Sequence, residues 1–269
     1  GTGFDVMFED AEGDVIRVKV KAHDKAGNTG EFSEFSEFVN IDNTKPDVNI
    51  TNTNENSWIT GNLEITETDS DANLFKCFYK VQNVFLNAGG KVTVDWTETP
   101  CNALFTINTK TVCPVDGENA CIVYKKAQDK ACNEVTRSKQ FDTDNNPPGL
   151  DKIIGEPNYG ENGSYVTTKT MFKIDAIDSA SGVKELCYKI NNGVPVCVNS
   201  VEMVDKLTTS FNFLEESEHT LTFWAIDNVG LKKEVTQTHF VDETPPMTIK
   251  SYSNLFTGMK DWVGENFII

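Results

Sequence analysis

A short acidic phrase that ends in proline occurs three times along the 269-residue chain, and this repetition constrains the fold more than any other feature. The copies are NIDNTKP at 40–46, QFDTDNNPP at 140–148 and FVDETPP at 240–246. Each copy follows a segment with Ala-x-Asp, a turn and a polar strand. The anchoring residues are Asp24, Asp129 and Asp227, spaced 105 and 98 residues apart. Such self-similarity indicates an array of like units.

A second motif lies upstream in each unit and predicts where the boundaries fall. Its copies begin near residue 57 with SWITGNLEITETDSD, near 164 with SYVTTKTMFKIDAIDSASG and near 261 with DWVGENFII. We therefore predict two complete units, 47–147 and 148–246. Residues 1–46 are interpreted as the last strands of a preceding unit and 247–269 as the first strands of a following one, so that the chain is a window from a longer array. In an alternative interpretation, the two partial ends complete each other between subunits of a polymer.

Within a unit, the hydrophobic pattern is that of β-strands. The segments 16–22 and 221–225 alternate apolar and polar residues, which is the period of a half-buried strand. Lys125 stands where the other copies have Val20 and Phe223, and either a bulge or an edge position would accommodate it. About seven short strands in each unit of about 100 residues predict an immunoglobulin-like sandwich. We expect an all-β fold of tandem immunoglobulin-like β-sandwich repeats, two complete and two partial.

Two turn motifs connect the sequence with a known group of proteins. One is Ala-x-Asp-x-x-Gly-Asn at 22–28, followed by a strand and by linkers such as Val-Asp-x-Thr-x-Pro; the other is Asp-Ser-x-Ser-Gly-Val at 178–183. With these motifs the whole chain resembles the extracellular immunoglobulin-like repeats of bacterial and archaeal surface-layer, adhesin and stalk proteins. The resemblance implies a structural role. Unit 47–147 departs from the pattern, because Cys132 replaces the turn glycine and an insertion lengthens the hairpin at 84–100.

The seven cysteines predict disulfide-stapled hairpins. In CYKINNGVPVC, a three-residue loop with Gly193 in the left-handed conformation would place Cys187 opposite Cys197, within bonding range. Cys77 and Cys101 are read as the equivalent pair of the preceding unit, and Cys113 with Cys121 as a third hairpin. This leaves Cys132 unpaired or bonded outside this window. Reduced, buried thiols are the alternative, while the absence of a CxxC pair argues against zinc.

Disulfides indicate an oxidising environment, so we expect an extracellular or cell-surface location. Asn49 and Asn162 begin glycosylation sequons and are candidate glycan acceptors. The formal charge of −17, from 41 acidic and 24 basic residues, repels phosphate backbones and argues against nucleic-acid binding. No apolar run is long enough to span a bilayer, so we expect no membrane insertion within this window.

The linker aspartates form candidate calcium sites. In the predicted topology, each linker lies at the same end of a sandwich as the loop between its second and third strands (BC) and the loop between its last two strands (FG). Hard oxygen ligands converging from three segments suit Ca²⁺, and cadherin-type arrays are similar in this respect. The candidates are Asp42, Asn43, Glu67, Asp69, Asp71 and Asp129 for one unit, and Asp142, Asp144, Asp175, Asp178 and Asp227 for the next. The alternative is that these aspartates only cap their own turns.

No nucleophile elbow, metal-binding His-Glu-x-x-His or phosphate-cradling loop occurs, so we predict no catalysis. The leading hypothesis is a structural repeat region of a secreted or surface-anchored protein, whose partners are neighbouring copies or other surface proteins. A second hypothesis is a glycan- or protein-binding module, with Trp96, Tyr165 and Trp224 as the aromatics to test. A third is the accessory region of a secreted enzyme.

Overall fold

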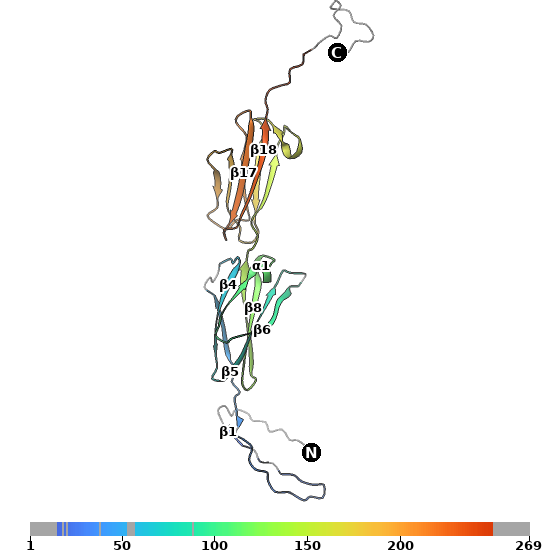
Figure 1. Ribbon diagram of the computed structural model, residues 1–269, viewed down its shortest axis with the longest axis vertical. Helices are drawn as coiled ribbons and strands as arrows, with labels where there is room; N and C mark the ends of the chain where they lie inside the picture. Colours follow the sequence, from blue (N-terminus) through green and yellow to red (C-terminus); the bar gives the residue numbers. More distant parts are fainter. Residues whose placement is uncertain are drawn as a thin grey trace, which may run out of the picture.

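The computed structural model describes residues 15–17, 19, 21–37, 39–52, 57–87 and 89–249. Two β-sandwiches lie end to end, and the chain passes from one to the other through residues 144–148 (Figure 1). Each sandwich has its own cluster of buried apolar residues. The predicted all-β fold of sandwich units is confirmed.

The first sandwich packs a three-stranded sheet, in the order β3-β4-β7, against a four-stranded sheet, in the order β6-β5-β8-β9. All its strand pairs are antiparallel. The strands are β3 Asp47–Asn52, β4 Asn62–Ser70, β5 Leu74–Asn83, β6 Lys91–Thr99, β7 Leu104–Asn108, β8 Gly117–Asp129 and β9 Glu134–Thr143, with the single helical turn α1 at Thr109–Val112. The alternating burial along β4 shows why this segment is a strand: every second side chain faces the core.

The second sandwich repeats this plan and adds a small hairpin. Its sheets have the orders β10-β13-β16 and β11-β12-β18-β17-β14-β15, and only β12 runs parallel to its neighbour β18. The strands are β10 Gly149–Ile154, β11 Asn158–Tyr159, β12 Tyr165–Val166, β13 Phe172–Ile177, β14 Val183–Ile190, β15 Val196–Asn199, β16 Lys206–Phe211, β17 Glu218–Asp227 and β18 Lys232–Val241, and a 3-10 turn η1 spans Glu161–Gly163.

Among the described residues of the N-terminal part, 15–17, 19, 21–37 and 39–46, strand pairing is short. Strand β1, Val15–Ile16, pairs with β2, Val39–Asn40, and a bridge joins His23 to Thr29 around the turn at Asp24. Lys21 and Ala22 are described but lie outside any strand. The third copy of the upstream motif, at 261–269, lies outside the described residues.

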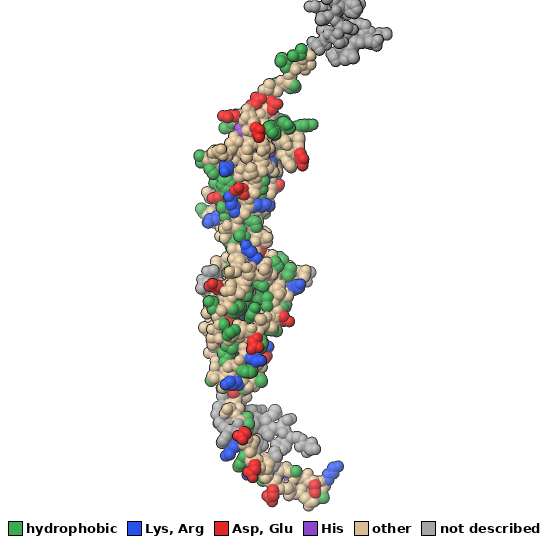
Figure 2. Space-filling model, viewed as in Figure 1, with side chains coloured by type: hydrophobic (Ala, Val, Ile, Leu, Met, Phe, Trp, Pro, Cys, Tyr) green, Lys and Arg blue, Asp and Glu red, His purple; other side chains and the backbone are tan. Residues whose placement is uncertain are grey.

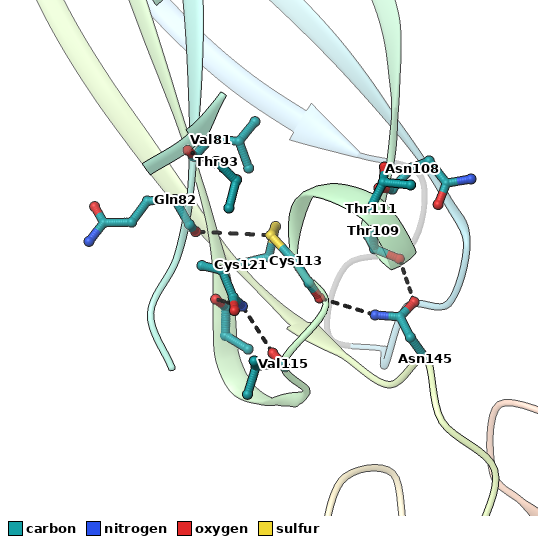
Figure 3. The surroundings of a disulfide bond; sticks show 12 residues. Val81, Gln82, Thr93, Asn108, Thr109, Thr111, Cys113, Val115, Cys121 and Asn145 are labelled. Atoms are coloured by element: carbon teal, nitrogen blue, oxygen red, sulfur yellow. Dashed lines mark hydrogen bonds between the residues drawn. A yellow bond between two sulfur atoms is a disulfide. The ribbon is translucent and has the colours of Figure 1, made fainter. Parts of the chain in front are cut away.

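Three disulfides join the pairs that the sequence predicts. Cys187–Cys197 and Cys77–Cys101 have Cα atoms 4.1 and 5.2 Å apart, and Cys113–Cys121 closes the segment between α1 and β8 (Figure 3). Cys132 is exposed and free.

Two details of the hairpin prediction are wrong. In the turn after β14, Asn191 and not Gly193 has positive φ, and the loop runs from 191 to 195. Cys77 also does not correspond to Cys187: it pairs with Ala127, whereas Leu186 pairs with the corresponding Ala225. Since a shift of one residue reverses the face of a strand, Cys77 belongs to the hydrophobic cluster between the sheets, whereas Cys187, although also buried, does not.

Lys125 occupies neither an edge nor a bulge. Strand β8 lies between β5 and β9, and Lys125 pairs in continuous register with Tyr79 on one side and Arg137 on the other. Its side chain is only 1% exposed, so a charged group points into the core of the first sandwich.

Candidate metal centre

The FG turns are built on one aspartate each, and their hydrogen bonds explain the recurring motif. In the three turns, the backbone N–H groups of Asn28, Asn133 and Leu231 donate to Oδ1 of Asp24, Asp129 and Asp227, four residues earlier. The residue before each of these has positive φ: it is Gly27, Cys132 or Gly230. Backbone capping, one of the two interpretations of these aspartates, therefore accounts for one of the two oxygens of each carboxylate.

The hydrogen-bond partner of the second carboxylate oxygen differs between the turns. The side-chain amides of Asn28 and Asn133 donate to Oδ2 of Asp24 and Asp129, at 2.6 and 2.8 Å. In the third turn the corresponding residue is Leu231, which has no donor side chain. Oδ2 of Asp227 is buried and has no hydrogen-bond partner, in a residue that is 0% exposed. A buried, unpaired carboxylate oxygen costs free energy, so this atom fits a cation ligand.

Two triads of aspartates stand at the entrances of the two sandwiches. The first joins Asp42 of the linker, Asp71 of the BC loop and Asp129; the second joins Asp144, Asp178 and Asp227 from the corresponding places. In each triad one oxygen from every carboxylate lies within 4.8 Å of the other two. Three carboxylates at such spacing supply half of the oxygen ligands that Ca²⁺ takes, the rest being backbone carbonyls or water.

The second triad is the more deeply buried. Asp144, Asp178 and Asp227 are 1%, 7% and 0% exposed. Asp178 caps the BC loop by accepting from the N–H groups of Ala180 and Gly182, at 2.8 and 3.2 Å. Ser181 donates its N–H and its hydroxyl to Asp144. Linker and loop are therefore joined at the triad itself.

Burial, and then mutual repulsion, raise the pKa values of Asp227 and Asp178. The pKa of Asp227 is raised to about 6, first because the carboxyl is buried and then because Asp144 and Asp178 are close. Burial, and then the charge of Asp144, also raise the pKa of Asp178. A divalent cation would reverse both causes by giving the clustered charge a partner.

One neighbouring acid was missed from the sequence. Asp116, between α1 and β8, accepts from the backbone of Asn145 and from the side chains of Asn145 and Asn146. Burial raises the pKa of Asp116, and the charge of Asp144 adds to the effect. Its sequence neighbourhood, PVDGENA, looks like an ordinary turn, so only the fold brings it near the linker.

Three predicted ligands are wrongly placed by the sequence analysis. Glu67 and Asp69 lie on β4 and Asp175 on β13, so none belongs to a BC loop. Glu67 and Asp69 point into the first core and form ion pairs with Lys125. Asp175 accepts from Lys206, Lys173 and Thr208, at 2.8, 3.1 and 2.7 Å. Each of these three carboxylates therefore already has a lysine against one of its oxygens.

The remaining linker candidates also lie outside the triads. Asp142 is the last but one residue of β9 and accepts from the N–H of Asn119 at 2.7 Å. Asn43 is exposed.

The linker between the sandwiches is fastened on both sides. Asn145 accepts from the hydroxyl of Thr109 at 2.8 Å and donates to the carbonyl of Cys113 at 3.2 Å (Figure 3). The Cys113–Cys121 disulfide holds that carbonyl in place. Asp144, the preceding residue, accepts from Ser181 of the second sandwich. Two consecutive linker residues are therefore anchored, one to each sandwich.

The other predicted site residues lie apart from the triads. The sequon residues Asn49, on β3, and Asn162, in η1, are both exposed. Of the aromatics, Tyr165 stacks on Phe240, while Trp224 donates to Glu185 at 3.2 Å. On the face shown in Figure 2, acidic and basic side chains are interspersed over both sandwiches. Among the described residues, no helix has the length and apolar character needed to cross a membrane.

The sequence matches no protein-family profile and no curated protein. Solved structures give distant matches. Dimeric latent PorU from Porphyromonas gingivalis aligns at 14% identity over 75% of this chain and 24% of its own, with a TM-score of 0.30. A Ca²⁺-stabilised adhesin of an Antarctic bacterium aligns at 12% identity over 85% and 57%, with a TM-score of 0.38. A tetra-tandem repeat from the extending region of a large adhesion protein aligns at 20% over 86% and 57%, with a TM-score of 0.33.

The chain thus spans less than two thirds of the length of each of these three structures. Similarity at this level carries no information about what this chain binds, so the function has to be argued from its own residues.

Proposed function

We propose that the chain is a non-catalytic structural repeat region of a secreted or cell-surface protein, such as a surface-layer component, filament, adhesin or stalk. In this proposal the units are 47–147 and 148–246, and the partial units 1–46 and 247–269 continue the array. Prolines and Ca²⁺ stiffen the joints, and neighbouring copies or other surface proteins are the partners.

The buried Oδ2 of Asp227 is the observation that carries the proposal. It is an acceptor without a donor, in a triad with Asp144 and Asp178, at the point where the linker enters the second sandwich. A cation there would connect the linker, the BC loop and the FG turn in one coordination shell. Fixing those three segments fixes the direction in which one sandwich leaves the other, which is the property that a spacer needs.

The three disulfides and the joint support the same proposal. Covalent staples are typical of small extracellular domains. The linker prolines restrict the backbone just after the aspartates, and Pro46 and Pro148 are themselves buried.

Calcium titration tests the proposal. Isothermal titration calorimetry of the EDTA-treated chain should show binding of Ca²⁺ that Asp227→Asn abolishes. Small-angle scattering should show a longer, narrower distribution of molecular dimensions with Ca²⁺ than with EDTA. Asp142→Asn is a matched control, because Asp142 lies in the same linker region but outside the triad. No calcium heat, or scattering curves that are identical under both conditions, would contradict the proposed stiffening of the joint.

A further inference from the structure

The first sandwich also contains a buried cluster of three ionisable side chains that belongs to neither triad. Lys125, on β8, contacts Oε2 of Glu67 and lies 3.5 Å from Oδ2 of Asp69, both on β4. The side chains are 1%, 0% and 0% exposed. The amine and the two carboxylates therefore meet inside the sandwich, between its two sheets.

The cluster is poorly satisfied as a set of ions. Two carboxylates and one ammonium leave an excess negative charge in the core, and Oε1 of Glu67 and Oδ1 of Asp69 are buried without hydrogen-bond partners. Burying unpaired charge is costly, and even a paired buried ion pair gains little over apolar packing. Burial raises the pKa of Glu67, although the hydrogen bond from Lys125 and its charge oppose this effect.

The second sandwich shows what an ordinary core has at these positions. The registers align Asp129 with Asp227 and Ala127 with Ala225, so Lys125 corresponds to Phe223. Counting back along β13 from Asp178, which occupies the position of Asp71, puts Ile174 and Ala176 where β4 has Glu67 and Asp69. All three counterparts are buried and apolar. Where the second sandwich has a hydrophobic contact, the first sandwich therefore has an amine against a carboxyl group.

We propose that Lys125 and Glu67 condense to an intramolecular amide that cross-links the two sheets of the first sandwich. The neutral Nζ of Lys125 attacks Cδ of protonated Glu67. A C–N bond forms, the C–O bond to the Glu67 hydroxyl breaks, and one water molecule leaves. Asp69 receives a proton from Nζ and returns it to the leaving hydroxyl. The ammonium–carboxylate pair contains all the atoms of the amide and the water, so no other reactant is required.

The product resolves the faults of the ionic cluster. It replaces two buried formal charges with a neutral amide, whose nitrogen is the Lys125 atom that lies 3.5 Å from Oδ2 of Asp69. Holding the two reacting groups in contact supplies the effective concentration that an amine and an acid lack in water. Because β4 belongs to the three-stranded sheet and β8 to the four-stranded sheet, the bond would oppose separation of the sheets under tension.

The mass of the purified chain tests the proposal directly. After folding, denaturation and reduction of the disulfides, the intact chain should weigh one water molecule less than its sequence. Proteolysis and tandem mass spectrometry should give a branched peptide that joins the segments with Glu67 and Lys125. Lys125→Arg should restore the full sequence mass, whereas the matched control Lys126→Arg, beside Lys125 on β8, should keep the loss of water.

A wild-type mass equal to that of the sequence overturns the proposal and leaves a buried ion pair. This decision needs no variant to fold, because it is made on the unmodified chain. A second measurement tests Asp69: after refolding, Asp69→Asn should form the bond about 10²-fold or more slowly, as expected when a proton-transferring group is removed. An unchanged rate would exclude Asp69 as the relay.

Discussion

Replacing Asp227 by asparagine should stabilise the protein in the absence of calcium, and calcium should cancel most of this advantage. In EDTA, Asp227 is 0% exposed and its pKa lies at about 6, above the usual value of about 3.9 for aspartate. An acid whose folded pKa is raised stabilises the fold most when protonated. Its contribution is therefore lost as pH rises through the window from about 4 to about 6. A shift of about two pKa units corresponds to about 3 kcal/mol at pH 7.5.

Asparagine removes this cost, because it is neutral and keeps an oxygen in the position of Oδ1 to accept from Val229 and Leu231. In EDTA at pH 7.5, Asp227→Asn should be more stable than the wild type by up to about 3 kcal/mol, and the gap should close by pH 4. In Ca²⁺ at a hundredfold excess over its dissociation constant, the wild type should gain about 2.7 kcal/mol and the variant nothing. The difference in stability between the variant and the wild type should therefore shrink to near zero in Ca²⁺.

Urea unfolding followed by the fluorescence of Trp224, on β17 of the same sandwich, measures these differences. Asp129→Asn is the contrasting variant, because Oδ2 of Asp129 already accepts from the side-chain amide of Asn133. An asparagine there would set one amide group against another, so it should destabilise the first sandwich in EDTA. If Asp227→Asn is less stable than the wild type throughout pH 5–8 in EDTA, the argument from the unpaired oxygen is refuted.

Three further changes have defined outcomes. Asp175→Asn should lower the free energy of unfolding by about 1 kcal/mol at pH 7, after allowance for its half-exposed lysine partners. The pKa of Asp175 is lowered to about 2, first by the hydrogen bond from Lys206. In urea titrations the difference between wild type and variant should therefore vanish as the pH falls from about 4 to 2. Cys132→Gly should raise the stability by about 1 kcal/mol in thermal unfolding, because Cys132 has φ 71° where glycine is unstrained. Replacing Cys77 and Cys101 together by alanine should lower the Tm more than the same change at Cys187 and Cys197, because the first pair closes 24 residues against 10 and Cys77 lies in the core.

The repeat pattern predicts the fold and the two triads because both depend on period and on loop ends. Once the turns at Asp24, Asp129 and Asp227 are aligned, the linker aspartates and the BC-loop aspartates of each unit are predicted at the same end of its sandwich. This reasoning uses only topology, and it correctly brings together Asp144 with Asp178. It could not find Asp116, since that residue reaches the linker from the segment between α1 and β8, which the Cys113–Cys121 disulfide closes.

The errors come from side-chain direction within strands. The composition of the run ITETDSD is typical of a loop, so the sequence predicts that its acids lie in the BC loop. In the structure β4 continues to Ser70, and alternation turns Glu67 and Asp69 inward. Lys125 was the available signal: a lysine at an inward position requires inward acids on the facing sheet, and β4 has two at a spacing of two residues. The correspondence of Cys77 with Cys187 failed for a similar reason, because hairpin position does not fix the face of a strand to within one residue.

A single side chain distinguishes the two joints. At the first, the amide of Asn133 donates to Asp129 and to the carbonyls of Asp42 and Thr44, and Asn73 donates to Asp42 at 2.8 Å. Linker and loops are thus fastened by direct hydrogen bonds. At the second, Leu231 replaces that asparagine, so the amide that would have satisfied the FG aspartate is absent, and the carboxylates are more deeply buried. The first joint is therefore held by an amide clamp. Under the proposed function a cation takes the place of this clamp at the second joint, so only the second joint should respond to EDTA.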